Sequence, residues 1–127
     1  MKEFKLPKEF ATKWIETLRT TTEKQGRKGL LADDGYCCLG IACLVGGATP
    51  DDIYSKEGET VISDFSESKD KKYHFKISDK EFYDKIPPEL KGACVNNILV
   101  SKLVELNDSG VPFKEIADWI EENVELY

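Results

Sequence analysis

The residues best suited to ligand chemistry form a short basic turn after the first predicted helix. This basic turn, Gln25-Gly26-Arg27-Lys28-Gly29, combines two glycines with two cations, and Arg19 lies one or two helical turns upstream. Glycines let the backbone approach a ligand closely, and Arg and Lys side chains form charge-assisted hydrogen bonds to phosphate oxygens. The same residues also suit a helix C-terminus with basic side chains near its dipole, followed by a plain turn. Both interpretations stay open at the level of sequence.

Two aromatic residues could extend such a site. Tyr36 precedes a cysteine-rich segment, whose helical N-terminus would present unpaired N–H groups to an anion. Tyr36 and Trp14 could stack on a nucleotide base, but both residue types serve equally well in a core. The candidate ligand-binding residues are Trp14, Arg19, Gln25, Gly26, Arg27, Lys28 and Tyr36.

The segment from Cys37 to Val45 is apolar apart from its thiols, which is typical of a helix buried on all sides. It holds three of the four cysteines, and Cys94 is distant. Structural zinc sites favour cysteine pairs separated by about two to four residues. Cys37 and Cys38 are adjacent instead, and on a helix they diverge by about 100°. We therefore predict no metal site and interpret the thiols as reduced packing groups of a cytosolic protein.

Residues that could form a catalytic site are scarce. His74 is the only histidine, and it falls on the polar face of a predicted hairpin, which is a poor place to hold a Cys–His pair. Carboxylate pairs such as Asp33-Asp34 and Glu121-Glu122 lie in predicted turns or on an exposed helix, away from apolar surroundings that would raise their pKa. No nucleotide-binding or hydrolase motif is present. We predict no catalytic residue and no cofactor, so an enzyme is the less favoured interpretation.

Charge is unevenly distributed along the 127 residues. The net charge is −6, and residues 105–127 hold one Lys against seven Asp or Glu, which also gives −6. This acidic end argues against non-specific nucleic-acid binding, which needs a basic face. The acidic helix either solvates the domain or docks onto a partner through Asp118, Glu121, Glu122 and Glu125. No apolar run suits a bilayer span or a secretory signal, so we expect a cytoplasmic protein without membrane contact.

Hydrophobic periodicity predicts a single domain of residues 1–127 with four or five helices and one β-hairpin. The expected helices cover about residues 7–23, 37–45, 78–86, 98–106 and 113–120. A charged turn between Val61-Ile62 and the segment 73–77 predicts the hairpin, inside an insertion of about residues 50–85. The predicted fold class is mainly α (α+β), a compact helical domain around the buried helix 37–45.

Several motifs together resemble a family of small accessory proteins of tailed phages and prophages. These motifs are Trp14-x-x-x-Leu18-Arg19, Gln25-Gly26 with Leu30, Tyr36-Cys37-Cys38-Leu39-Gly40-Ile41, Leu106-Asn107-Asp108-x-Gly110, and Phe113-x-x-Ile116-Ala117-Asp118-x-Ile120-Glu121. The resemblance covers both ends and the centre of the chain and leaves the hairpin region as the variable part. It implies phage origin and a shared fold more than an activity. Pro112 stands where the family often has Ser or Thr, so this chain lacks a capping hydroxyl there.

Together these patterns favour a non-catalytic phage protein that antagonises a host process, such as defence, in the bacterial cytoplasm. The basic turn indicates a small anionic ligand, for example a nucleotide signal, that the protein would sequester. Analogy with small phage proteins adds the expectation of a homo-oligomer. Two alternatives stay open. One is an acidic inhibitor that docks onto a host nucleic-acid enzyme, and the other is an enzyme that degrades such a nucleotide.

Overall fold

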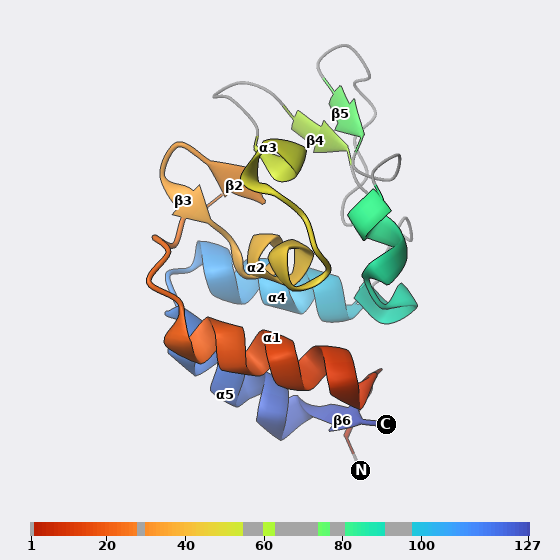
Figure 1. The fold of residues 1–127 in the computed structure, drawn as a ribbon. Coiled ribbons are helices and arrows are strands. Elements are labelled where there is room, and N and C mark those ends of the chain that lie inside the picture. Colours follow the sequence, from red (N-terminus) through yellow and green to blue (C-terminus); the bar gives the residue numbers. More distant parts are fainter. Residues whose placement is uncertain (1, 28–29, 55–59, 63–73, 77–80, 91–97) are drawn as a thin grey trace.

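The computed structural model describes residues 2–27, 30–54, 60–62, 74–76, 81–90 and 98–127. In this part of the chain, five α-helices dominate an α+β fold that also has short 3₁₀ helices and two-stranded sheets (Figure 1). The mainly helical fold class predicted from the hydrophobic periodicity is therefore confirmed. Among the described helices, none is both long enough and apolar enough to cross a membrane.

Helices α1 (Lys8–Thr20) and α5 (Phe113–Asn123) form one layer of the molecule (Figure 1). They run antiparallel, because the start of α1 is bonded to Tyr127 whereas its end meets Asp118. Each helix buries an apolar stripe of helical spacing, although Phe10, at the start of the stripe predicted for α1, is only partly buried. The buried residues are Ala11, Trp14, Ile15 and Leu18 on α1, and Phe113, Ile116, Ala117 and Ile120 on α5.

Helix α2 (Cys38–Val45) is the buried centre of the fold and packs against both α1 and α4 (Ile98–Asp108). Every residue from Cys38 to Cys43 is buried, as the apolar segment predicts. Gly40 makes close packing possible, since a Cβ there would lie 1.9 Å from the main-chain oxygen of Leu30. The chain at Leu30 therefore crosses α2 in direct contact with the helix backbone.

Smaller elements surround this centre. Strands β2 (Leu31–Ala32) and β3 (Gly35–Tyr36) form an antiparallel hairpin around the predicted turn at residues 33–35. Helix α3 (Pro50–Ile53) begins after Thr49, whose N–H donates to Asp52 Oδ2 at 2.9 Å. The short helix predicted before Pro87 is present as the 3₁₀ helix η2 (Glu81–Lys85), and the predicted first residue of that helix, residue 78, lies outside the described residues. A second 3₁₀ helix, η3, covers Pro88–Leu90.

Strands β4 (Thr60–Ile62) and β5 (His74–Lys76) lie where strands were predicted, but they pair in parallel. The prediction of a β-hairpin is therefore wrong, because a hairpin joins antiparallel strands. Periodicity identifies strands without giving their direction, and the length of the connection is the better indicator. The connection between the two strands, residues 63–73, lies outside the described ranges and has 11 residues. Common hairpin loops have about two to five residues, whereas parallel strands need a long crossover.

Two more features differ from the prediction. Strands β1 (Phe4–Leu6) and β6 (Val124–Leu126) form a parallel pair, and three residues each are too few to show an alternating pattern. Helix α1 ends at Thr20, earlier than expected. The next residue, Thr21, is extended with ψ 140°, in keeping with the low helix propensity of β-branched residues.

Candidate functional site

Asn107 is the buried polar centre of the molecule. Its side chain is 1% exposed, and it is the one polar residue in the core of the described part of the chain. Its Oδ1 accepts from the Cys38 N–H at 3.2 Å and from Gln25 Nε2 at 3.0 Å. Its Nδ2 donates to the Gly26 carbonyl at 2.9 Å and to Asp108 Oδ1 at 3.3 Å. Asn107 thus joins α4, the start of α2 and the basic turn.

Gln25 belongs to the same network and points inward. Besides its bond to Asn107, Nε2 donates to the Val111 carbonyl at 2.8 Å, and Oε1 accepts from the Phe113 N–H at 3.2 Å. These bonds tie the basic turn to the connection between α4 and α5. The Gln25 side chain therefore acts here as a support of the turn, with both ends of its amide engaged by the protein.

Gly26 lies where three parts of the chain meet. Its N–H donates to the Tyr36 carbonyl at 2.7 Å. A Cβ at this position would lie 2.5 Å from Asp34 Oδ1 and 2.6 Å from the Gly35 carbonyl oxygen. The next N–H, that of Arg27, donates to Asp34 Oδ2 at 3.0 Å. Only glycine fits at residue 26, and the groups that approach it closely are the Asp34 side chain and the Gly35 main chain.

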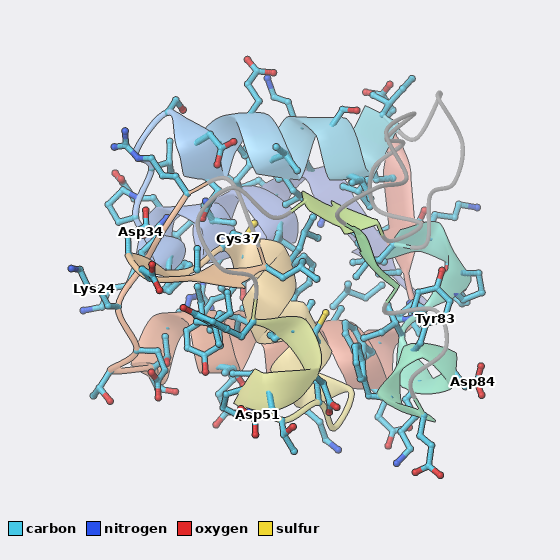
Figure 2. The ribbon with its side chains drawn as sticks, turned by 90° about the horizontal axis from the view of Figure 1, so that it is seen from above. Lys24, Asp34, Cys37, Asp51, Tyr83 and Asp84 are labelled. Carbon is cyan, nitrogen blue, oxygen red and sulfur yellow. The ribbon has the colours of Figure 1, made fainter. Side chains whose placement is uncertain are left out.

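The cations near the turn have different surroundings. Arg27 is exposed, and its Nη2 would be 3.1 Å from a Cβ at Gly110, so its guanidinium lies over the α4–α5 connection. A cation just beyond a helix C-terminus is favoured by the helix dipole. Lys24 is exposed at the same edge of the molecule as Asp34 (Figure 2). Lys28 lies outside the described residues.

Arg19 joins the two helices of the α1–α5 layer. Its Nη1 and Nη2 bind both carboxylate oxygens of Glu121 at 2.9 Å, and Nη2 also binds Asp118 at 2.7 Å. Hydrogen bonds to Glu121 and Asp118 raise the pKa of Arg19, and its guanidinium in turn lowers the pKa of Glu121. Arg19 is therefore engaged by carboxylates of α5, whereas the Arg27 guanidinium lies over the α4–α5 connection.

The two aromatic candidates belong to the core. Trp14 is fully buried, and its Nε1 donates to the Cys38 carbonyl at 3.0 Å. Tyr36 is 7% exposed, and burial, with a smaller contribution from Glu23, raises its pKa. A base cannot stack on a ring whose faces are covered by protein. This placement corrects the expectation that Trp14 and Tyr36 contact a ligand.

The cysteines of α2 support its packing. Cys37 is the residue before the helix, and its thiol accepts from the Gly40 N–H at 3.4 Å as an N-cap. The Cys38 thiol donates to the Leu103 carbonyl at 3.6 Å. Cys37, Cys38 and Cys43 are buried free thiols, and Cys94 lies outside the described residues. Within the described ranges, no three His, Cys, Asp or Glu residues are grouped so as to hold a metal ion.

We expect alkylation by iodoacetamide to be slow at these thiols. Burial raises the pKa of Cys37 to about 11, so roughly 0.1% of it is thiolate at pH 8, against roughly a quarter of an unperturbed cysteine. Burial also raises the pKa of Cys38 and Cys43. Peptide mass spectrometry should show a labelling rate that is at least about 100-fold lower in the native protein than in urea. Equal rates in both conditions would contradict a buried, protonated Cys37.

Three residues important to this region were not identified as such from the sequence: Lys24, Asp34 and Asn107. Asn107 carries a recognisable signal, because Leu99, Leu103 and Asn107 follow at i, i+4 and i+8 on the inner face of α4. An amide in such a stripe indicates a buried polar network. Lys24 and Asp34 carry no comparable signal, since charged residues in turns are common on any surface.

A family model described as "Domain of unknown function (DUF8296)" matches residues 6–124. No curated protein and no solved structure shows significant similarity to the chain. The matched range runs from the end of β1 to the start of β6 and includes the Asn107 network, the basic turn and α2. Because the match covers nearly the whole chain, the protein belongs to the DUF8296 family.

Proposed function

We propose that this protein is a non-catalytic accessory protein of tailed phages that antagonises host defence by sequestering a small anionic ligand, such as a nucleotide signal. The phage context rests on the sequence resemblance. The ligand class rests on one observation. In the basic turn, the main-chain N–H of Arg27 holds a carboxylate oxygen, and the cations Lys24 and Arg27 are exposed on either side of Gly26. A main-chain donor beside cations is a common way to bind phosphate oxygens.

The support behind the turn favours binding. The Gly26 carbonyl is fixed by Asn107, and Gln25 is fixed at both ends of its amide. The donor at Arg27 is thus held in place before any ligand arrives. A preorganised site loses little conformational entropy when a ligand binds, so more of the interaction energy is retained as affinity. The proposed site consists of Lys24, Gly26 and Arg27, with Lys28 as a further candidate from the sequence.

Binding can be tested with extracted ligand and charge-removing variants. The purified protein is incubated with a nucleotide mixture, washed and denatured, and the released compound is identified by mass spectrometry. We expect an intact nucleotide. Calorimetry with that nucleotide should then show that Lys24→Ala combined with Arg27→Ala weakens binding at least about 10-fold, because each lost charge-assisted bond costs about 1.5–3 kcal/mol. Thermal stability should stay nearly unchanged, since both side chains are exposed.

Lys13→Ala is the control for the general effect of removing a surface cation, because Lys13 is exposed on α1 and lies outside the turn. It should leave affinity unchanged within about twofold, as expected for a screened surface charge. An altered nucleotide would identify an enzyme instead of a sequestering protein. Equal weakening by Lys13→Ala would mean that the basic turn is not the site.

A second candidate, an inhibitor that binds a basic host protein, is favoured by the geometry of Arg19. This residue fixes Asp118 and Glu121 on the outer surface of α5, with side chains 63% and 52% exposed. Glu122 and Glu125 are exposed further along the chain. Fixed carboxylates cost little entropy when a cationic surface docks onto them. Failure to retain any nucleotide, together with capture of a basic host protein that is lost on Glu122→Lys, would favour this candidate.

A further inference from the structure

The carboxylate of Asp34 occupies the basic turn as a bound anion would. Its Oδ2 accepts from the main-chain N–H of Arg27 at 3.0 Å. Its Oδ1 is so close to Gly26 that a Cβ there would be only 2.5 Å away. Oδ2 therefore occupies the Arg27 N–H as a phosphate oxygen would, and Oδ1 lies beside Gly26 together with the Gly35 carbonyl oxygen, which would be 2.6 Å from the same Cβ.

An external anion and the Asp34 carboxylate exclude each other at this position. They carry charge of the same sign, and both need the Arg27 N–H, which has one hydrogen to donate. We infer that Asp34 is an internal competitor, which lowers the affinity of the basic turn for phosphate-containing ligands and leaves the turn when such a ligand binds. This inference rests on the proposed function and adds a means of regulating the same site.

The position of Asp34 suits an exchange of this kind. Asp34 is exposed in the turn of the β2–β3 hairpin, so its side chain can rotate into solvent without disturbing the core. The main chain around the donor stays in place, because Gly26 is bonded to Tyr36 and Asn107. The competitor is thus movable, whereas the donor that it covers is fixed.

The experiment uses inorganic pyrophosphate as the probe and the full chain with Asp34→Ala. Isothermal titration at low salt should show binding about 5- to 10-fold tighter than in the wild type. This change lies just below the roughly 10- to 150-fold of a charge-assisted hydrogen bond, because Asp34 is exposed to solvent. Asp34→Asn keeps an acceptor oxygen but loses the charge, so its affinity should fall between those of the wild type and Asp34→Ala. Thermal melting checks that each variant is folded.

Asp33→Ala is the matched control. Asp33 is the neighbouring exposed carboxylate in the same hairpin turn, but it accepts a hydrogen bond from the Tyr54 hydroxyl, whereas the Arg27 N–H donates to Asp34. The Asp33→Ala variant loses the same charge, but the Arg27 N–H stays bonded to Asp34. Pyrophosphate affinity should therefore change by no more than about twofold. An equal gain in Asp33→Ala and Asp34→Ala would overturn the inference, because the effect would then be general electrostatics.

The outcomes separate this inference from the function on which it rests. If Arg27→Ala weakens pyrophosphate binding but Asp34→Ala does not tighten it, the turn binds anions and the competitor role is wrong. If Lys24→Ala combined with Arg27→Ala has no effect, or if neither the wild type nor Asp34→Ala binds pyrophosphate, the proposed site is wrong and the competitor role falls with it. Tighter binding in Asp34→Ala that is lost again on adding Arg27→Ala is the supporting result.

Discussion

Replacement of Asn107 by Ala should lower the free energy of unfolding by about 3–5 kcal/mol. The change leaves the Cys38 N–H and the Gly26 carbonyl without their partner in a buried setting. An unsatisfied buried group costs about 1–3 kcal/mol, and the cavity adds to this cost. Urea denaturation followed by circular dichroism measures the effect, and an unchanged m-value would show that the native state is still cooperative.

Asn123→Ala is the control for this prediction. Asn123 Nδ2 donates to the Trp119 carbonyl at 2.8 Å within one helix, and the side chain is only partly buried. Its removal should cost less than about 1 kcal/mol, because water can replace the lost donor. A similar loss in both variants would show that the Asn107 network contributes no more than a local helix contact.

The second large effect is expected for Gly40→Ala, which should destabilise the protein by about 3 kcal/mol or more, or prevent it from folding. The new Cβ would lie 1.9 Å from the main-chain oxygen of Leu30 and 2.8 Å from its carbonyl carbon. These are backbone atoms, so no side-chain rotation relieves the overlap, and α2 and the Leu30 segment must move apart. Overpacking in a core costs about 1–3 kcal/mol even where side chains can adjust. The soluble yield and the urea midpoint are the measurements.

Gly46→Ala separates this overlap from the general effect of adding a methyl group to α2. Gly46 follows the same helix with φ −73° and ψ −6°, which alanine adopts readily. Its Cβ would meet the Ile86 Cδ1 at 2.7 Å, and that atom is the end of a flexible side chain. We expect a change within about 1 kcal/mol, because the gain in helix propensity offsets part of the contact. A decrease in the free energy of unfolding as small as this in Gly40→Ala would contradict the close crossing of α2 by the chain at Leu30.

The sequence predicts the main helices of this fold because each of them carries a clear pattern. The apolar segment after Cys37 has no polar face, and α1 and α5 each show one stripe, so burial alone specifies them. The pairing of β4 with β5 could not be predicted in the same way, since alternation does not encode strand direction. Strands β1 and β6 are too short to show an alternation of apolar and polar residues. They are specified by contacts between residues about 120 apart along the chain.

The candidate site was predicted in part, because residue type does not reveal which partner a side chain will find. Glycine at residue 26 predicts a close approach of a ligand to the backbone, and the groups that lie close to it in the structure are the Asp34 carboxylate and the Gly35 main chain. Arg19 has the positive charge that a phosphate-binding residue needs, yet its partners are carboxylates of α5, about 100 residues away in the sequence. Long-range pairing of this kind requires the tertiary structure. The motif residues Gln25, Cys38 and Asn107, distant in sequence, meet in one buried network.

The antiparallel packing of α1 on α5 also affects how the chain folds during synthesis. The apolar stripe of α1 is complete at Leu18, but its partner stripe starts only at Phe113. At about 5–20 residues per second, a ribosome needs roughly 5–20 s to make the intervening segment. During that time the side of α1 that packs against α5 lacks its final cover, so the nascent chain exposes a surface that chaperones recognise. The last helix thus completes the fold, and truncation before α5 would leave a polypeptide prone to aggregation.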